Sequence, residues 1–465
     1  MKTEVKGLVR QLYQVAGLPA ADFSTCELTG NEPLLPSSFQ VGALAQGTIA
    51  AAALAAGQLA MVRGGAMPAI AVDMHDAEYE CTGYFELDKR APETWAPLSG
   101  LYPCADGFVR IHANFDHHRD GALALLGLTY DESVTQETVT KALAKITRLD
   151  FESRAAKAGM PIYALRNFTE WDTHPQAKWL EQAPLFTITR IAAADPISLP
   201  ELGAGLPLAG IRVLDLTRIL AGPVCGRTLA NYGADVMLVN SPNLPNIEHI
   251  ADTSRGKRSV YLDLLKAEDA TTLKHLVSDA HVFVQGYRPG GVAALGFDPE
   301  ALASLRPGLV TVSLSAFGKG GPWADRRGFD SLVQTATGFN HAEGLAAGID
   351  GPKALPVQIL DFASGFIMAF AVSAALIRQQ QEGGSWHIDI SLAQTANWLR
   401  SLGQLDDNFA RGKKARREMN RNARLVQTES GFGLLGAIPH AAKLNGKVLQ
   451  PTLPSVPPGT HPASW

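Results

Sequence analysis

The stretch Ile211-Arg212-Val213-Leu214-Asp215-Leu216 decides the fold, because it reads as a buried strand that begins a strand–helix–strand unit. Ala221-Gly222-Pro223 opens the helix with proline in its first turn, where the missing N–H costs nothing. The helix is predicted to end near Tyr232, with Gly233 as its C-terminal cap, and residues 235–239 form the next strand. This order of elements predicts a βαβ unit.

Residues 259–262, 281–284 and 309–314 read as further strands with helical segments between them. Repeated βαβ units favour a parallel sheet. The sequence carries no GxGxxG after the first strand, no GxxxxGK[ST] and no HExxH, which disfavours NAD, FAD and a bound metal. We therefore predict an α/β protein with a Rossmann-like parallel sheet as its large domain and a smaller α+β domain.

Composition narrows the class of protein. The 465 residues carry a net charge of −4, which gives no support to a nucleic-acid or polybasic membrane role. Cys26, Cys81, Cys104 and Cys225 lie far apart without CxxC spacing, so we expect reduced thiols in a cytoplasmic protein. Residues 1–16 read as an amphipathic helix without the hydrophobic core of a signal peptide.

Residues 41–62 are rich in alanine and glycine and are long enough to resemble a membrane span. They also contain Gln46, Thr48 and Gln58. Alanine gains little from burial in lipid, so a close-packed internal helix is the favoured interpretation.

A second informative stretch is Val357-Gln358-Ile359-Leu360-Asp361-Phe362-Ala363-Ser364-Gly365. Its apolar run ends at one carboxylate, and small residues and a long apolar segment follow. We expect an extended entry, a turn and the start of a buried helix, where free N–H groups favour an anion. Asp361 is therefore either an ordinary N-cap or a functional carboxylate.

The chain contains a weak internal repeat. Residues 44–73 and 360–392 each hold a small-residue turn, an apolar helix, a Gly-Gly pair and a strand that ends near aspartate. Counting back from these aspartates places Ala45 opposite Asp361, so the two copies agree in shape and differ in the carboxylate.

An ordered set of motifs resembles the family III CoA-transferases, which include formyl-CoA and carnitine CoA-transferases. The matching stretches lie within residues 206–395 and are 208–223, 233–236, 255–263, 286–290, 315–322, 328–330, 360–361 and 387–392. The resemblance implies that Asp361 is the nucleophile. It also implies acyl-CoA and carboxylic acid as substrates, no tightly bound cofactor and an interlocked homodimer.

Residues 1–205 resemble the later half of the same family, so the two halves stand in permuted order. We predict three regions. Residues 1–205 supply the small domain and returning helical segments. Residues 206–404 form the Rossmann-like half with Asp361, and residues 405–465 are a tail that completes the small domain.

By this resemblance, Asp361 forms a mixed anhydride with the acyl group and then a thioester with CoA. The N–H groups of Ala363, Ser364 and Gly365 are expected to stabilise the oxyanions. Asp330 is either a second active-site carboxylate or a helix cap. The expected CoA-binding residues are Arg218, which follows the first strand at the edge where ligands bind in open α/β sheets, and four cations that we place in loops after the strands: Arg255, Lys257, Arg258 and Arg288. The alternative for these four is ordinary surface charge.

Some residues depart from the family pattern. Asn240-Ser241-Pro242 replaces an expected acidic residue and arginine, and Leu220 stands where formyl-CoA transferase has glutamine. Phe329 occupies the position of the racemase histidine, which disfavours a racemase because racemisation needs a second acid–base group. Aromatic residues near Phe329 and Phe362 favour an acid less polar than oxalate.

Asp116-His117-His118-Arg119-Asp120 resembles a metal or acid–base cluster, but we interpret it as a capping loop. His112, on the preceding strand, is expected to be packed or solvated. The alternatives to CoA transfer are an acyl-CoA racemase or lyase on the same fold and a non-catalytic CoA-binding protein.

Overall fold

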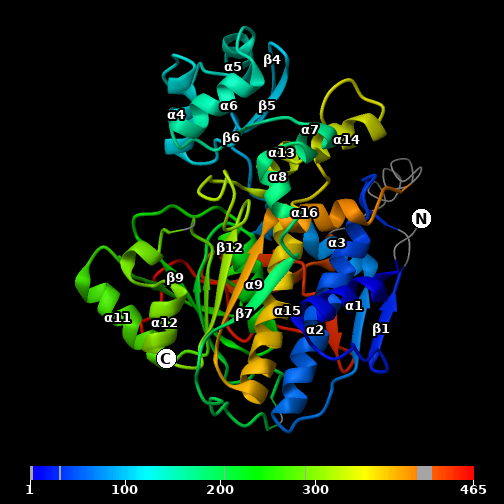
Figure 1. Ribbon diagram of the computed structural model, residues 1–465, viewed down its shortest axis with the longest axis vertical. Coiled ribbons are helices and arrows are strands. Elements are labelled where there is room, and N and C mark those ends of the chain that lie inside the picture. Colours follow the sequence, from blue (N-terminus) through cyan, green and yellow to red (C-terminus); the bar gives the residue numbers. More distant parts are fainter. Residues whose placement is uncertain (1–3, 31–32, 204, 289, 406–421) are drawn as a thin grey trace.

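The computed structural model describes residues 4–30, 33–203, 205–288, 290–405 and 422–465. Its main body is a seven-stranded sheet in the order β10-β9-β8-β11-β12-β13-β7 (Figure 1). The strands are β7 (Phe186–Ala192), β8 (Arg212–Leu216), β9 (Asp235–Asn240), β10 (Lys257–Tyr261), β11 (Val282–Gln285), β12 (Val310–Ser315) and β13 (Ser385–Ser391). Neighbours from β10 to β13 pair in parallel, and β7 is antiparallel to β13. The predicted α/β class with a parallel sheet is confirmed.

The strand order reverses beside β8. From β8 the chain moves outward through β9 to β10, then returns to β11 on the other side and continues through β12 to β13. The loops after β8 and β11 therefore diverge at the carboxyl edge of the sheet. Such a reversal opens a crevice where ligands bind in α/β proteins.

Helices cover both faces of this sheet because side chains on a strand alternate between the faces. Val213 of β8 packs into the large core with α9 (Ala221–Asn231), whereas the next residue, Leu214, packs into a second core. That second core contains side chains of α11 (Ala267–Ser278) and α12 (Pro299–Leu305). A strand buried on both faces explains the continuous apolar run in the sequence.

Two long apolar helices, α2 (Val41–Val62) and α15 (Ile359–Glu382), pack against each other inside the large core. Both are long and apolar enough to cross a membrane by composition alone, but they are internal helices here: the most apolar 18-residue window is 83% buried in α2 and 100% buried in α15. Small residues permit the close packing. A Cβ added at Gly365 of α15 would lie 2.6 Å from the carbonyl oxygen of Ala221 in α9.

The internal repeat is visible in the structure. Helix α2, strand β2 (Ile70–Asp73) and helix α3 (Met74–Cys81) repeat the order α15, β13 and α16 (Leu392–Ser401). The N-caps of α2 and α15 have matching backbones, with φ −80°, ψ 54° at Gln40 and φ −80°, ψ 62° at Gln358. Aligned on these caps, Ala43 lies opposite Asp361, which corrects the predicted register by two residues.

The chain that follows each copy of the repeat completes the sheet of the other copy. Strand β7 comes from the first part of the chain and pairs antiparallel with β13. Strand β16 (Ala442–Leu444) comes from the tail and pairs antiparallel with β2, beside β1 (Cys26–Thr29). The two copies are therefore interlocked within one chain.

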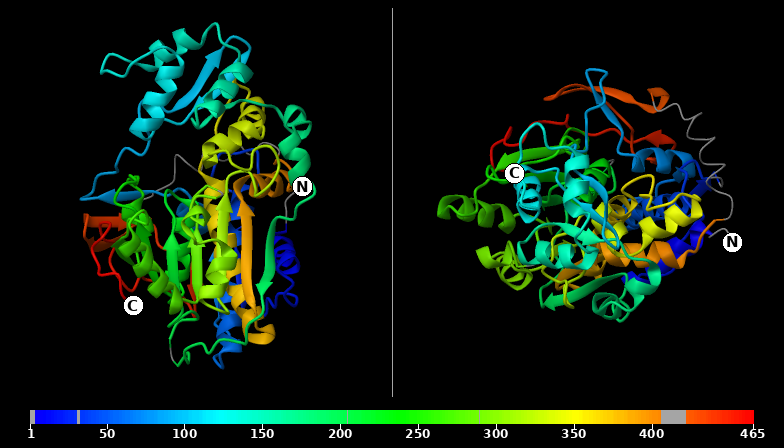
Figure 2. Two further views of the ribbon diagram at one scale, coloured as in Figure 1. Left: turned by 60° about the vertical axis from the view of Figure 1, so that its left-hand side comes forward. Right: turned by 90° about the horizontal axis from the view of Figure 1, so that it is seen from above.

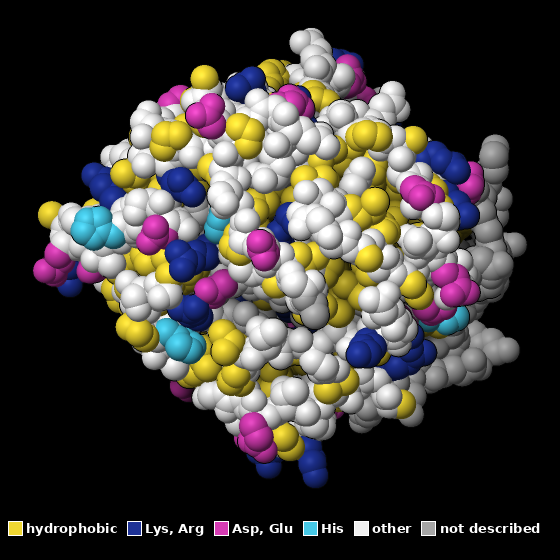
Figure 3. Space-filling model, turned by 90° about the horizontal axis from the view of Figure 1, so that it is seen from below, with side chains coloured by type: hydrophobic (Ala, Val, Ile, Leu, Met, Phe, Trp, Pro, Cys, Tyr) yellow, Lys and Arg dark blue, Asp and Glu magenta, His cyan; other side chains and the backbone are white. Residues whose placement is uncertain are grey.

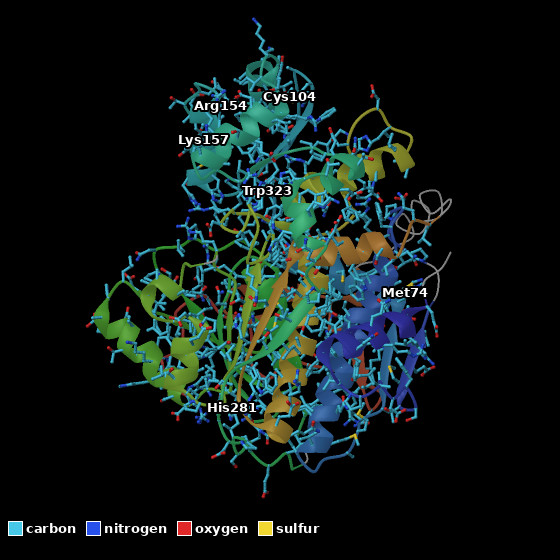
Figure 4. All side chains as sticks on the ribbon, in the orientation of Figure 1. Met74, Cys104, Arg154, Lys157, His281 and Trp323 are labelled. Carbon is cyan, nitrogen blue, oxygen red and sulfur yellow. The ribbon has the colours of Figure 1, made fainter. Side chains whose placement is uncertain are left out.

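A small domain stands above the carboxyl edge of the sheet in Figure 1 and in the left view of Figure 2. It has its own core and consists of β4 (Gly100–Cys104), β5 (Gly107–Ile111), β6 (Ile162–Ala164), α4 (Asp116–Leu125), α5 (Gln136–Leu143) and α6 (Arg148–Lys157). Trp323, labelled in Figure 4, marks its junction with the sheet, where the tryptophan ring packs at 5.3 Å from Tyr163 of β6.

The tail does not complete this small domain, which corrects our expectation for residues 405–465. Strands β14 (Val426–Ser430) and β15 (Gly433–Ala437) instead join β3 (Phe85–Leu87) in a separate sheet. The indole N–H of Trp465 donates to Leu276 of α11. Residues 406–421 lie outside the described part of the chain. The remaining elements include α1 (Val5–Ala16), α7 (Phe168–Asp172), α8 (Pro175–Leu180), α10 (Ile250–Thr253), α13 (Asp330–Ala336), α14 (Phe339–Ala346) and β17 (Lys447–Val448).

Candidate active site

A cavity of about 590 Å³ lies between the carboxyl edge of the sheet and the small domain. The loops after β8, β9, β10, β11 and β12 line it from the sheet side. Phe115, His117 and His118 line it from the small domain, and Asp361 contributes a carboxylate. The cavity therefore spans the point where the strand order reverses.

Asp361 is the third residue of α15, whose N-cap is Gln358. The helix begins two residues before Asp361, at Ile359, so the expected extended entry and the interpretation of Asp361 as an N-cap are both wrong. Asp361 is only 8% exposed and lines the cavity. Burial, and then the neighbouring carboxylate of Asp330, raise the pKa of Asp361 well above its usual value.

Asp330 caps α15 although it belongs to α13. Its carboxylate accepts the backbone N–H of Asp361 at 2.9 Å and the side-chain amide of Gln334 at 2.5 Å. Asp330 therefore combines the two roles that we had considered as alternatives, because it caps a helix and also lies beside the candidate nucleophile. Burial raises the pKa of Asp330 to about 6, against the opposing effect of these hydrogen bonds.

Ala363, Ser364 and Gly365 do not offer free N–H groups, which corrects the expected oxyanion site. Because α15 begins at Ile359, the backbone N–H groups from Phe362 onward donate to carbonyls four residues earlier, as Phe362 does to Gln358 at 3.1 Å. All three residues are fully buried within the helix, and the Ser364 hydroxyl bonds Thr395 at 2.7 Å.

The start of α9 is another source of N–H donors, which no sequence motif indicated. Ala221 and Gly222 are the first two residues of this helix, so their N–H groups have no partner within it. Ala221 lines the cavity, and Gly365, one turn beyond Asp361, packs against it. Ile219, which precedes the helix, has φ +76°, a strained conformation for a β-branched residue.

Two of the five predicted CoA-binding cations, Arg218 and Arg288, line the cavity. Arg326 and Arg327 also line it and were not singled out from the sequence. Seen from below, the opposite end of the molecule shows positive and negative side chains interspersed among apolar ones (Figure 3). Among the described residues, in contrast, the cavity lining gathers four guanidinium groups and two carboxylates, Asp263 and Asp361.

Arg255, Lys257 and Arg258 do not line this cavity, which corrects their placement in loops after strands. Lys257 and Arg258 belong to strand β10. The Lys257 ammonium is fully buried and bonds Asp215 at 2.8 Å, and Arg258 bonds Asp235 at 2.6 Å. Arg255 follows α10 and bonds Asp252 at 2.5 Å. These cations hold the fold together through ion pairs.

The histidines of the small domain adjoin the cavity, and the segment that we expected to be a capping loop forms the start of α4. His117 and His118 lie in α4, and both line the cavity. Within the described residues, no three His, Cys, Asp or Glu side chains converge as a metal site would require. Burial, and then the positive charges of His117, Arg327 and Arg218, lower the pKa of His118 to about 3, so the ring is neutral.

Phe329 lines the cavity, and the ring of His112 stacks on its far side at 3.9 Å with an interplanar angle of 12°. His112 is packed as expected, with 5% exposure, and is not one of the residues lining the cavity. It therefore does not restore the acid–base group that Phe329 lacks.

Comparisons with known proteins identify the family of this chain. The model of CoA-transferase family III matches residues 208–440, and the chain belongs to this family. A succinate–glutarate CoA-transferase of Agrobacterium fabrum is 37% identical over 205 residues, covering 40% of this chain and 51% of that protein. An acyl-CoA transferase of Gibberella moniliformis is 31% identical over 314 residues, covering 63% of this chain and 55% of that protein.

The acetyl-coenzyme A transferase nodX of Hypoxylon pulicicidum is 34% identical over 208 residues, covering 43% of this chain and 35% of that protein. The chain thus spans between 35% and 55% of the length of these curated relatives. A crystal structure of a CAIB/BAIF family protein from Brucella suis is 28% identical with a TM-score of 0.38, covering 50% of this chain and 65% of that one.

Proposed function

We propose that this protein transfers CoA from an acyl-CoA to a carboxylic acid, with Asp361 as the covalent nucleophile. The observation that carries the proposal is the position of Asp361, a carboxylate at the N-terminus of a buried helix and inside the cavity at the carboxyl edge of the sheet. Carboxylates form covalent acyl intermediates in enzymes of several classes.

In the first half of the reaction, a carboxylate oxygen of Asp361 attacks the thioester carbonyl of the donor. The C–S bond breaks, CoA leaves as a thiolate and a mixed anhydride remains. The thiolate then attacks the aspartyl carbonyl of this anhydride, which releases the donor acid and leaves an aspartyl-CoA thioester.

In the second half, the acceptor carboxylate attacks the aspartyl thioester and displaces the thiolate, which gives a second anhydride. The thiolate attacks the acceptor carbonyl of this anhydride, so the new acyl-CoA forms and the carboxylate of Asp361 returns. The N–H groups of Ala221 and Gly222 at the start of α9 are the proposed donors to the oxyanions.

Acyl-CoA enters as a substrate, and the proposal includes no tightly bound cofactor. Arg218 and Arg288 are the proposed contacts for CoA phosphates, because both line the cavity beside the strand reversal. A cytoplasmic location and a homodimer also remain proposals. Helix α15 packs against α2 of the same chain, so that face of α15 is covered. A second subunit would therefore bind through another surface. Light scattering after size-exclusion chromatography would measure the mass.

Two other functions are less favoured. A racemase or lyase on the same fold would need an acid–base pair across the substrate, and Phe329 provides no such group. A non-catalytic CoA-binding protein would have no use for a buried, unneutralised carboxylate, because burying such a group is unfavourable.

The test is intact-protein mass spectrometry after incubation with a panel of acyl-CoAs and quenching with hydroxylamine or borohydride. We expect a modification that maps to Asp361 and disappears in Asp361→Asn, which keeps the shape of the side chain and loses the nucleophile. Exchange at the α-carbon without acyl transfer would indicate a racemase. CoA binding without any adduct would indicate a non-catalytic protein.

A further inference from the structure

A second cavity, of about 510 Å³, lies at the amino edge of the seven-stranded sheet. The position of His281 in Figure 4 shows that this is the end of the molecule away from the small domain. Pro200 and Gly210 line the cavity from the linker before β8. Arg212 lines it from the first position of β8, and Arg306 lines it from the end of α12.

His281 offers an N–H group to this cavity. The residue is only 7% exposed and is fixed beside β8, because its backbone N–H donates to the carbonyl of Arg212 at 3.0 Å. The Nδ1 atom of the His281 ring accepts the backbone N–H of Arg212 at 2.9 Å. A backbone N–H can only donate, so the proton of the neutral ring is on Nε2. Within the described residues, Nε2 has no hydrogen-bond partner, so it is available to a ligand.

Two guanidinium groups accompany this ring. The Nε atom of Arg306 donates to the carbonyl of Ala280, directly before His281, at 3.3 Å. The guanidinium of Arg212 packs at 5.5 Å from the centre of the Trp465 ring. In the part of the chain that the structure describes, neither guanidinium forms an ion pair with a carboxylate. Burial, and then the charges of Arg306, Arg212 and Arg63, lower the pKa of His281 to about 4, so all three cations act on this ring.

Two carboxylates also line the cavity, but they leave these cations without a direct partner. Asp235 bonds Arg258 of β10 at 2.6 Å, so its charge is already balanced. Asp279 is exposed, and water and salt screen its charge. Holding Arg212 and Arg306 around one buried ring costs free energy that a bound anion would offset.

The linker wall of the cavity is fixed in place. Arg63, which follows α2, donates to the carbonyl of Pro200 at 2.5 Å and to that of Pro207 at 2.9 Å. Gly210 lies against Pro200, because an added Cβ there would meet the Cβ atom of Pro200 at 2.9 Å. The donors on the sheet and the opposite wall are therefore already in position, which lowers the entropic cost of binding a ligand.

We propose that this cavity binds a small phosphorylated compound, whose phosphate group accepts hydrogen bonds from Arg212, Arg306 and Nε2 of His281. A phosphate monoester carries nearly two negative charges and three acceptor oxygens, which match two guanidinium groups and one further donor. A carboxylate has one charge and two oxygens and would leave part of this set unused. The remaining volume would hold the organic part of the compound.

This inference is independent of the proposed CoA transfer. Asp361 lies at the carboxyl edge of the sheet and the second cavity lies at the amino edge. The phosphorylated compound is therefore a ligand of a separate site and not a substrate of the candidate active site.

The test is isothermal titration of the full chain with glycerol 3-phosphate and, separately, with glycerate, which replaces the phosphate by a carboxylate. We expect saturable binding of glycerol 3-phosphate and binding of glycerate that is weaker by about 10-fold or more, the effect of one lost charged hydrogen bond. Arg306→Gln and Arg212→Gln should each weaken the binding of glycerol 3-phosphate by a similar factor. His281→Asn should also weaken it, because the amide oxygen can still accept the N–H of Arg212 but the Nε2 donor is lost.

The matched control is Arg154→Gln in the small domain. Arg154 also donates to a main-chain carbonyl, that of Leu125, and it lies at the opposite end of the molecule from His281 in Figure 4. The Kd for glycerol 3-phosphate should therefore be unchanged. Arg306→Lys provides a second variant if Arg306→Gln fails to fold, and we expect intermediate binding because the charge remains without the planar fork.

Hydrogen–deuterium exchange with and without glycerol 3-phosphate locates the bound compound. We expect slower exchange in residues 279–282 and at the start of β8. The absence of saturable binding, or equal affinity for glycerate, would overturn the proposal. Binding that is lost in Arg288→Gln and kept in Arg306→Gln would assign the phosphate to the cavity of Asp361 and would also overturn it.

Discussion

Replacement of Asp330 by asparagine tests how the site controls the charge of Asp361. The Asp330 carboxylate accepts the N–H of Asp361 at 2.9 Å, and its charge is one cause of the raised pKa of Asp361. The side-chain amide in the variant Asp330→Asn would keep an oxygen acceptor and lose the charge. We expect the pKa of Asp361 to fall towards its usual value, because removing a like charge at short range favours the ionised form of the carboxyl group.

The assay measures the rate of Asp361 acylation between pH 5 and 9 by quenched-flow mass spectrometry. Only ionised Asp361 attacks, so the wild-type rate rises with pH through the pKa of this carboxyl group. In Asp330→Asn the rise should occur at lower pH, whereas the plateau at high pH depends on how well the asparagine holds α15. An unchanged or upward-shifted rise would refute the electrostatic role of Asp330.

The same pair makes stability depend on pH. Both carboxyl groups have raised pKa values in the folded state, so the folded protein binds protons more tightly than the unfolded chain. Their contribution is fully present below the unfolded pKa of about 4 and is lost as pH rises through the folded values, near 6 for Asp330. Urea unfolding at pH 4 and pH 8 should show a smaller difference for Asp330→Asn than for the wild type, and an equal difference would contradict the argument.

Two further predictions concern the packing around the site. Gly365→Ala should destabilise the protein by about 1–3 kcal/mol in urea unfolding, because its Cβ would lie 2.6 Å from a backbone oxygen of α9. Gly7 in α1 serves as the control, because a Cβ added there would meet nothing within 4 Å. Gly7→Ala should therefore stabilise the protein by about 0.5–1 kcal/mol. Equal effects at the two positions would contradict the packing argument. Lys257→Met should cost about 3–5 kcal/mol by leaving Asp215 buried without its partner. The KM for acyl-CoA of the folded Lys257→Met fraction should be unchanged, and a large increase would restore Lys257 to the substrate site.

Much of the fold followed from local patterns. Continuous apolar runs predicted β8, β9, β11 and β12 to within about one residue, because a strand buried on both faces has no polar side. The helix at Val41–Val62 was recognised as internal since its small residues suit close packing. The start of α15 was misplaced, because Gln358 caps that helix by backbone conformation and no side-chain hydrogen bond marks the position.

The candidate site was only partly visible in the sequence. Motif order selected Asp361, and strand order implied Arg218 and Arg288, since loops after parallel strands meet at one edge. The same reasoning misassigned Lys257, because an isolated lysine in the sequence does not reveal a buried aspartate 42 positions away. The oxyanion donors were also misplaced, because the start of a helix determines which N–H groups remain free.

The sequence by itself determined the parallel sheet, the family and the choice of Asp361, because each depends on periodicity or on motifs within short stretches of chain. Only the tertiary structure brought Asp330 to the N–H of Asp361 across 31 positions and His118 to Arg327 across 209. The burial of these side chains, the charges around them and their proton affinity all depend on such contacts between distant segments. No local pattern in the sequence encodes these contacts.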